Sequence, residues 1–166
     1  MKDTKYDYAD NKCIKEAAEL FGSTRSEENL FILFNVLIDR MLANAEAPAA
    51  MVDVNGVMDF NKIMNLSQGD TFTVDQELRF RIETVSTGNG IEWIPLYTDE
   101  EEINRQSTAD IHINMPIVNV IKGAYYGEGV EGLVINPFGK ALTVPKNILK
   151  LVVEKYEEIN MAATEE

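Results

Sequence analysis

The sequence predicts an α+β fold in which a mixed or antiparallel sheet packs against flanking helices. Helix-like and strand-like segments are interspersed along the chain, and no fixed-period repeat is visible. Hydrophobic residues make up 45% and charged residues 26% of the 166 positions, a balance typical of a folded domain. A chain of this length can bury a sizeable core without disulfides or metals. We therefore expect one globular domain.

The N-terminal segment is polar and predicts little structure of its own. Residues 13–21 are amphipathic and are followed by Gly22, which predicts a marginal helix after a loose tail. We expect residues 1–25 to lie outside the main domain and residues 26–160 to form it. Residues 161–166 are then a C-terminal tail.

The strongest helix signal follows Ser26. Serine is a preferred N-cap, and Glu27 and Glu28 suit the positive end of a helix dipole. The apolar residues that follow are too many for one stripe, so this helix is either enclosed by its own domain or shared with a second subunit. The candidate interface residues are Phe31, Phe34, Leu37, Ile38 and Met41.

Strand patterns follow this helix. Residues 49–55 form a short strand-like run, whereas residues 57–70 have few periodic cues and are expected to connect elements. Residues 77–85 alternate between apolar and polar side chains. A Gly-containing break at 86–90 then leads into a second apolar segment. Together these segments predict a hairpin.

Further elements fill the C-terminal half. Thr98 and Glu101 predict a capping box that starts a short helix ending near residue 106. Pro145 fits the first turn of a last helix, predicted over 146–159. Between them, the patterns predict a strand at 110–115, a helix at 117–128, a strand at 131–138 and an extended segment at 140–145.

The charge balance disfavours two classes of partner. The formal net charge is −13, from 28 acidic and 15 basic residues. Such a chain repels phosphate backbones and anionic lipid headgroups, so we expect neither nucleic acid nor a membrane as its partner. The acidic excess is either a solvated surface that keeps the protein soluble or a patch that recruits a basic partner.

Cysteine use and hydropathy predict a cytoplasmic protein. Cys13 is the only cysteine, so no internal disulfide can form. Residues 1–12 lack the apolar core of a secretory signal. The most apolar stretch, 29–42, contains charged residues and is shorter than the roughly 20 residues that a membrane span needs.

No catalytic, metal-binding or cofactor-binding motif is recognisable in the sequence. His112, the only histidine, alternates with isoleucines and is expected to face solvent or a bonded partner. The consecutive acids at 99–102 point in different directions on a helix, so they cannot converge on one ion. The glycines at 127–132 lack the lysine and serine of a phosphate-binding loop. We predict no catalytic residue, no metal and no cofactor.

Two strand-end turns are the remaining candidate site. The segment from Asn136 to Gly139 follows an apolar strand, and Thr98 follows another. Proline keeps the preceding asparagine out of helical geometry, and asparagine itself can stabilise a turn, so the segment is interpreted first as a turn. The alternative is a small-molecule pocket between the two turns. Its candidate ligand-binding residues are Trp93, Tyr97, Thr98, Asn136 and Phe138.

Two segments resemble the N-terminal domain of the SseB family, which is named after the enhanced serine sensitivity protein. They are "WIPLYTDEEEI" at 93–103 and "GLVINPFGKALTVPKNIL" at 132–149. The pattern joins a strand, an acidic turn into a helix, a hydrophobic run into Ile-Asn-Pro, and a closing helix. The resemblance covers roughly residues 27–160. It implies a cytoplasmic bacterial α+β domain and supplies no catalytic residue to carry over.

These observations leave two functional hypotheses. The first is a non-catalytic protein-interaction or regulatory module that binds an unknown protein or a second copy of itself. It follows from the lack of a catalytic motif, the over-apolar helix and the resemblance. The alternative is a small-molecule-binding protein or an unrecognised enzyme, with its pocket at the turns near Thr98 and Asn136.

Overall fold

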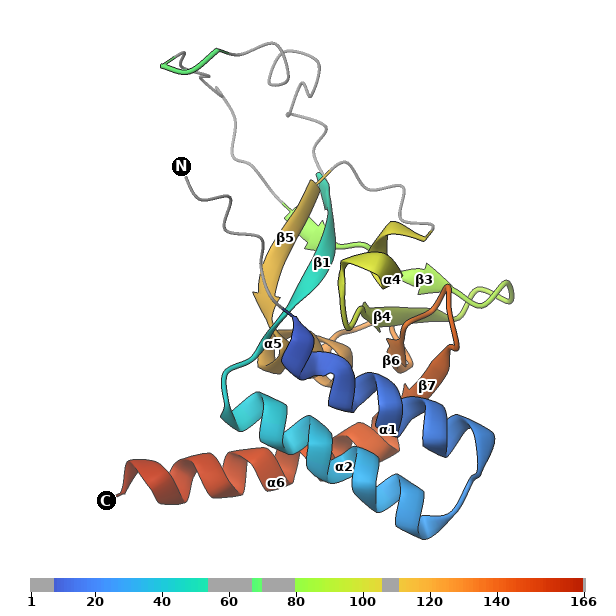
Figure 1. The fold of residues 1–166 in the computed structure, drawn as a ribbon, viewed down its shortest axis with the longest axis vertical. Helices are drawn as coiled ribbons and strands as arrows, with labels where there is room; N and C mark the ends of the chain where they lie inside the picture. The colour runs from blue at the N-terminus through green and yellow to red at the C-terminus, as the bar shows by residue number, and fades with distance from the viewer. Residues whose placement is uncertain (1–7, 54–66, 70–79, 106–110, 166) are drawn as a thin grey trace.

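A computed structural model describes residues 8–53, 67–69, 80–105 and 111–165 (Figure 1). Most of the predicted connection at 57–70 lies outside these residues. The helices are the 3-10 turn η1 (Ala9–Asn11), α1 (Lys12–Ser23), α2 (Glu27–Leu42), α4 (Glu100–Asn104), α5 (Ile117–Tyr126) and α6 (Lys146–Thr164). The strands are β1 (Glu46–Asp53), β2 (Phe80–Ile82), β3 (Val85–Ser86), β4 (Glu92–Leu96), β5 (Ile111–Pro116), β6 (Gly132–Ile135) and β7 (Leu142–Pro145).

The strands form two sheets, which confirms the predicted α+β class but divides the expected sheet in two. One sheet is antiparallel, with strand order β2-β1-β5. The other has the order β3-β4-β6-β7, and its central pair, β4 and β6, is parallel. Helices α1 and α2 lie side by side below the strands in Figure 1, while the last turns of α6 extend beyond the rest of the fold.

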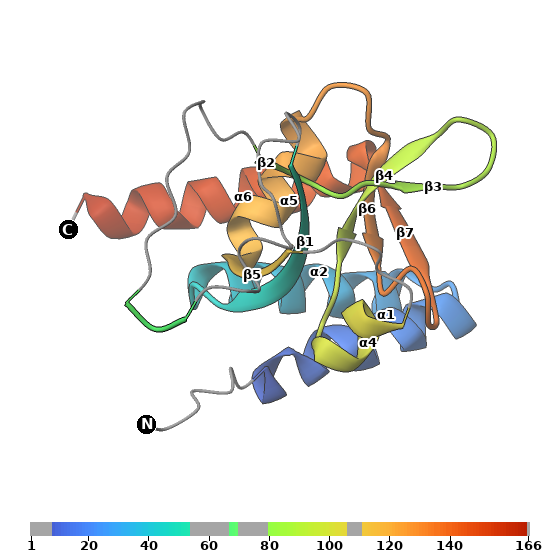
Figure 2. The ribbon, with the colours of Figure 1, turned by 90° about the horizontal axis from the view of Figure 1, so that it is seen from above.

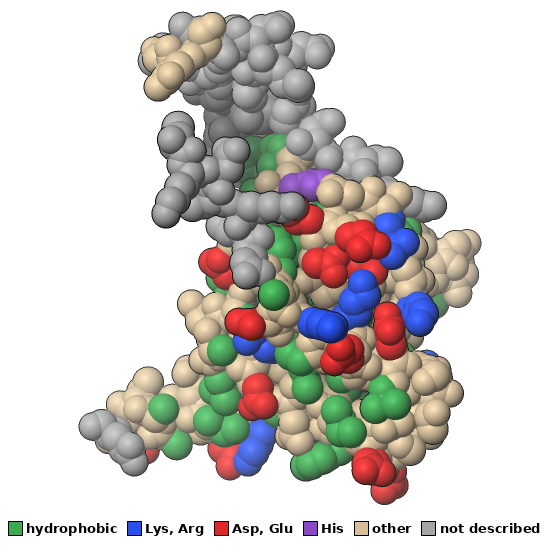
Figure 3. Space-filling model, viewed as in Figure 1, with side chains coloured by type: hydrophobic (Ala, Val, Ile, Leu, Met, Phe, Trp, Pro, Cys, Tyr) green, Lys and Arg blue, Asp and Glu red, His purple; other side chains and the backbone are tan. Residues whose placement is uncertain are grey.

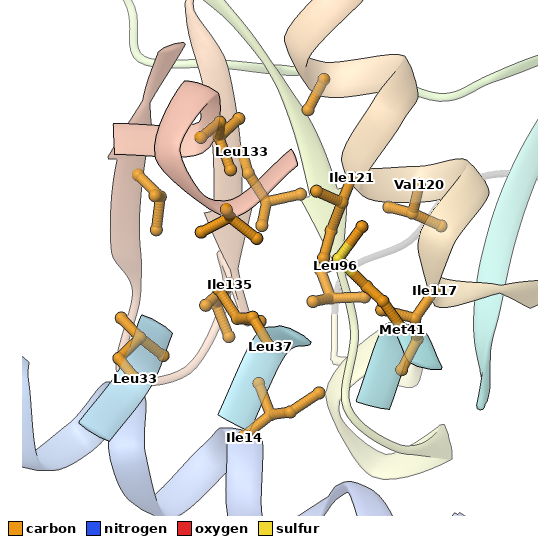
Figure 4. Packing of buried hydrophobic residues seen from close by; sticks show 14 of the residues in the cluster. Ile14, Leu33, Leu37, Met41, Leu96, Ile117, Val120, Ile121, Leu133 and Ile135 are labelled. Atoms are coloured by element: carbon orange, nitrogen blue, oxygen red, sulfur yellow. The ribbon is translucent and has the colours of Figure 1, made fainter. Parts of the chain in front are cut away.

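One hydrophobic core joins the helices to the four-stranded sheet. Leu37 and Met41 of α2 and Leu96 and Ile135 of the sheet are each at most 1% exposed, and they lie close together in Figure 4. Ile14 of α1 is fully buried in the same core. Each such side chain contributes about 1.5–3 kcal/mol by leaving water. The domain boundary expected near residue 25 therefore cuts through a single core.

Several helix predictions hold in detail. The Oγ of Ser26 accepts a hydrogen bond from the backbone N–H of Asn29 at 3.1 Å, as an N-cap does. Pro145 stands directly before α6. This helix continues to Thr164, five residues past the predicted end at 159 and into the expected tail.

Three further predictions differ from the structure. Strand β1 begins at Glu46, three residues before the predicted start, because its first half pairs with β5. Within the described part of the 77–85 segment, β2 pairs with β1 and only β3 forms a hairpin with β4. The cap of α4 is Asp99 rather than Thr98, since the Asp99 Oδ1 accepts from the Glu102 N–H at 2.9 Å.

The close approach of β6 to β7 requires Gly132. A Cβ at this position would press on the carbonyl oxygen of Val144 and lie 2.9 Å from the Cα of Pro145. By contrast, a Cβ at Gly123 in α5 would meet no atom within 4 Å.

We predict that Gly132→Ala destabilises the protein by about 1–3 kcal/mol, because the backbone of the next strand must shift. Gly123→Ala is the control and should stabilise by about 0.4–1 kcal/mol, since it removes the excess flexibility of glycine from the unfolded chain. Urea unfolding measures both free energies. Equal effects of the two substitutions would contradict the steric explanation.

Candidate functional site

The two predicted turns meet at one edge of the four-stranded sheet. Strands β4 and β6 are parallel with Leu96 opposite Ile135, so the residues that follow them are neighbours. The backbone N–H of Thr98 donates to the Oδ1 of Asn136 at 3.0 Å. In return, the Nδ2 of Asn136 donates to the Oγ1 of Thr98 at 3.0 Å. We call this reciprocal pair the Thr98–Asn136 clasp.

The clasp is buried. Thr98 is 1% exposed and Asn136 is 4% exposed. Asn136 has a φ of 48°, a left-handed conformation that asparagine tolerates better than most residues. Its side chain stabilises the turn through Thr98, which lies 38 residues away in the chain. The polar groups of both side chains already bond to each other. The clasp therefore joins the end of β4 to the end of β6.

The aromatic candidate residues split into two places. Tyr97 is fully buried and stacks on Phe138 with ring centroids 6.5 Å apart, next to Ala50 and Ile103. Burial, and secondarily the charge of Glu83, raises the pKa of the Tyr97 phenol above its ordinary value. Trp93 lies further back on β4, opposite Val85 of β3. Four of the five candidate ligand residues therefore gather at the strand ends, and Trp93 does not.

A buried carboxylate beside the clasp joins α1 to α4. Glu102 is 2% exposed, and its carboxylate lies 3.0 Å from the Lys15 Nζ and 3.1 Å from the Arg105 Nε. A Cβ on Gly139 would lie 2.5 Å from Glu102 Oε2, so this glycine makes room for the carboxylate. The charged side chains over α1 and α4 are visible on the surface in Figure 3. Both carboxylate oxygens are paired, so the cluster acts as a structural link between helices.

His112 and Cys13, the only histidine and the only cysteine in the sequence, take no part in the ion pairs of this cluster. His112 is exposed on β5. Cys13 is half-buried in α1, and its thiol donates to the carbonyl oxygen of Asp10 at 3.0 Å. Among the described residues, neither His112 nor Cys13 forms a side-chain hydrogen bond with a base or a nucleophile.

An apolar groove between α2 and α6 is the candidate functional site. Its volume is about 470 Å³. Phe31 is 63% exposed and Leu151 is 53% exposed, and the rings of Phe31 and Phe34 stack with centroids 6.4 Å apart. The apolar side chains that line the groove are Leu30, Phe31, Phe34, Ile148 and Leu151. Large apolar side chains gathered on an exposed face mark a binding surface more often than scattered ones do.

The rim of the groove is acidic. Glu27, Glu154 and Glu158 lie around it, together with a single cation, Lys155. Lys155 is already paired with Glu158, whose Oε2 lies 3.3 Å from its Nζ. Three carboxylates and one ammonium group give the lining a formal charge of −2. The carboxylate of Glu154 also lies 3.9 Å from Lys150, which is outside the lining.

The structure divides the predicted interface residues. Phe31 and Phe34 line the groove, whereas Leu37, Ile38 and Met41 are at most 4% exposed and belong to the core. Phe34 is half-buried and packs against the core, whereas Phe31 lies at the edge of the buried stripe of α2 and is exposed. The domain therefore encloses Leu37, Ile38 and Met41, and an interface stays a prediction for Phe31 and Phe34.

Sequence reasoning did not connect α6 to this surface. Ile148 and Leu151 complete the groove, although they lie far along the chain from α2. The sequence pattern of α6 contains a signal that could have identified Leu151 as a surface residue. Leu151 falls outside the buried stripe formed by Leu149, Val152 and Val153. An apolar residue off the stripe of an amphipathic helix indicates a second contact face.

We predict that Asn136→Ala lowers the free energy of unfolding by about 2–4 kcal/mol, because it leaves the buried Thr98 N–H unpaired and places alanine at a positive φ. Asn44 is the matched control, since its φ is 52° and its side chain is exposed. Asn44→Ala should cost only about 1–2 kcal/mol, from the backbone alone. Chemical denaturation compares the two, and equal losses would remove the role given to the clasp.

The pair between Lys15 and Glu102 predicts a loss of stability in alkali. The hydrogen bond to Glu102 raises the pKa of Lys15 above 10.5, and the charge of Asp99 adds to this while burial opposes it. A lysine whose pKa is raised by folding stabilises the fold below its unfolded pKa, and this contribution disappears as the pH rises through the folded pKa. The stability advantage of the wild type over Lys15→Met should therefore shrink above about pH 10.5.

Lys140 provides the control for this measurement. Its side chain is 78% exposed, and its Nζ lies 3.7 Å from Glu19. The difference in unfolding free energy between the wild type and Lys140→Met should stay nearly constant over the same pH range, because an exposed pair contributes little. A constant difference for Lys15→Met as well would show that its ion pair does not carry the effect.

The described residues contain no helix that is both long enough and apolar enough to cross a membrane. Comparisons of the chain with protein-family models, with curated proteins and with solved structures give no match.

Proposed function

We propose that the protein is a non-catalytic interaction module that binds an amphipathic, basic helix of another protein in the groove between α2 and α6. The observation that carries this proposal is the exposed pair Phe31 and Leu151 within an acidic rim. The predicted SseB-like family and the cytoplasmic location belong to the same proposal. A family without established catalytic residues fits a binding role.

The groove has the shape and chemistry that helix recognition uses. An amphipathic helix binds by placing its apolar face into a hydrophobic groove, with anchor residues one and two turns apart. Phe31, Phe34 and Leu151 offer apolar contact for such anchors. Aromatic side chains of this kind contribute much of the binding free energy when a partner covers them.

The charge of the rim selects the partner. Glu27, Glu154 and Glu158 favour lysine or arginine beside the apolar anchors. The net charge of −13 acts in the same direction at longer range. Two copies of this chain facing each other across a twofold axis would oppose the same acidic rims, which disfavours self-association here. Nucleic acid and anionic membranes are disfavoured for the same electrostatic reason.

Three synthetic peptides of about 18 residues, long enough to form helices, test the proposal. The first carries leucine on one face and lysine on the other. The second replaces lysine by glutamate, and the third replaces leucine by alanine. We predict that only the first binds, and that its affinity falls when the ionic strength rises from about 0.01 M to 0.15 M. Fluorescence anisotropy with labelled peptides measures all three.

Substitutions in the protein locate the binding face. Leu151→Glu should abolish binding of the lysine–leucine peptide, because it places a charge in the apolar groove. Leu20→Glu is the matched control, since Leu20 is also exposed, at 43%, but lies on α1 outside the groove. Thermal unfolding checks that both variants are folded. Equal binding of the lysine and glutamate peptides, or equal losses in both variants, would refute the proposal.

Light scattering separates this proposal from self-association. A monomer is expected for the protein alone. A dimer that Phe34→Glu converts to a monomer would instead assign the groove to a second copy of the chain, because Phe34 lines it.

A further inference from the structure

A second, smaller pocket lies where η1, the end of α2, β1 and β5 meet. Its volume is about 170 Å³, below the roughly 300–1,000 Å³ of pockets that take drug-sized ligands. The lining residues that matter for its chemistry are Tyr8, Asp10, Asn11, Arg40, Glu46 and Asn114. None of them lines the groove between α2 and α6, so the two sites are independent.

Two polar atoms at this pocket are buried without a hydrogen-bond partner. Asn11 is 1% exposed; its Nδ2 donates to the carbonyl oxygens of Glu46 at 2.8 Å and Thr98 at 3.3 Å, while its Oδ1 has no partner. The Nε of Arg40 is also buried and unpartnered. Leaving such groups unpaired costs about 1–3 kcal/mol each, so an unpaired acceptor and an unpaired donor on two residues that line one cavity favour an occupant there.

The charges around the pocket are of both signs and are not paired with each other. Asp10 and Glu46 line it together with Arg40, yet Arg40 takes part in none of the salt bridges among the described residues. A small anion alone would face two carboxylates. A small cation alone would face the guanidinium. A molecule that carries both charges a few atoms apart can satisfy both sides.

One wall of the pocket is fixed by hydrogen bonds within the protein. The hydroxyl of Tyr8 donates to the Oδ1 of Asn114 at 2.9 Å, and the Nδ2 of Asn114 donates to the carboxylate of Glu46. These bonds hold the acidic wall in place before any ligand arrives. A preorganised wall lowers the entropic cost of binding.

We propose that this pocket binds a small zwitterion with an ammonium group and a carboxylate, of the size of a short α-amino acid. The ligand carboxylate accepts a hydrogen bond from the guanidinium of Arg40. Its ammonium donates to the Oδ1 of Asn11 and lies on the side of Asp10 and Glu46. The volume of about 170 Å³ excludes a large aromatic side chain on the ligand.

Four probes of graded charge and size test this assignment by isothermal titration calorimetry. Alanine carries both charges, propionate lacks the ammonium, ethylamine lacks the carboxylate, and tryptophan is too large. Alanine should bind at least about tenfold more tightly than each of the other three, because only alanine forms charge-assisted hydrogen bonds on both sides and fits. Propionate or ethylamine binding as tightly as alanine would overturn the proposal.

Variants of the protein show whether binding occurs in this pocket. Arg40→Gln should weaken alanine binding at least about tenfold. Arg25→Gln removes the same charge from a residue that lies over the ring of Phe21 and should leave binding unchanged. If Arg40→Gln fails to fold, Asp10→Asn, with the exposed Asp39→Asn as its control, makes the same test from the ammonium side. Equal alanine affinity in Arg40→Gln or Asp10→Asn and its control would overturn the proposal.

Water is the competing occupant. At about 30 Å³ each, roughly six water molecules would fill the volume and could bond to the two unpartnered atoms. A crystal structure of the protein grown with alanine should show the amino acid bound between Arg40 and Asn11. Water alone in the pocket at saturating alanine would refute the inference.

Discussion

The reciprocal hydrogen bonds between Thr98 and Asn136 are the constraint on which the arrangement of this fold depends. They close the end of the only parallel strand pair among the described strands, β4 and β6. The carbonyl of Thr98 also accepts from Asn11, which attaches η1 and the start of α1 to the same point. Because these polar groups are buried, each must find a partner within the chain, and this requirement fixes the positions of three separate segments.

Two consequences for function follow from this junction. Polar groups that look like a binding site in the sequence are used for internal structure, so the strand ends are closed by their own side chains. Among the hollows that the described residues leave on the surface, two combine exposed apolar side chains or unpartnered polar atoms in one place. One is the apolar groove between α2 and α6, and the other is the polar pocket beside Asn11. Both surfaces lie where the hydrophobic core does not cover the side chains.

Local signals were predicted well because they depend on neighbouring residues. The cap at Ser26, the start of α6 after Pro145 and the exposed position of His112 each follow from a few adjacent positions. Thr98 and Asp99 are both good caps, and the choice between them depends on Asn136, which lies 38 residues away. Similarly, the pattern at 77–85 cannot reveal that β2 pairs with β1, since alternation does not specify the partner strand.

Composition, periodicity and capping are local properties, so they predict the α+β class and most of the helices, and they contain no recognisable catalytic motif. The packing of distant segments decided which apolar residues of α2 belong to the core and which line a groove. It also decided that Asn11 and Arg40 line one pocket. The reason is physical: burial and hydrogen-bond satisfaction are properties of residues distant in sequence and close in space, and no single segment encodes them.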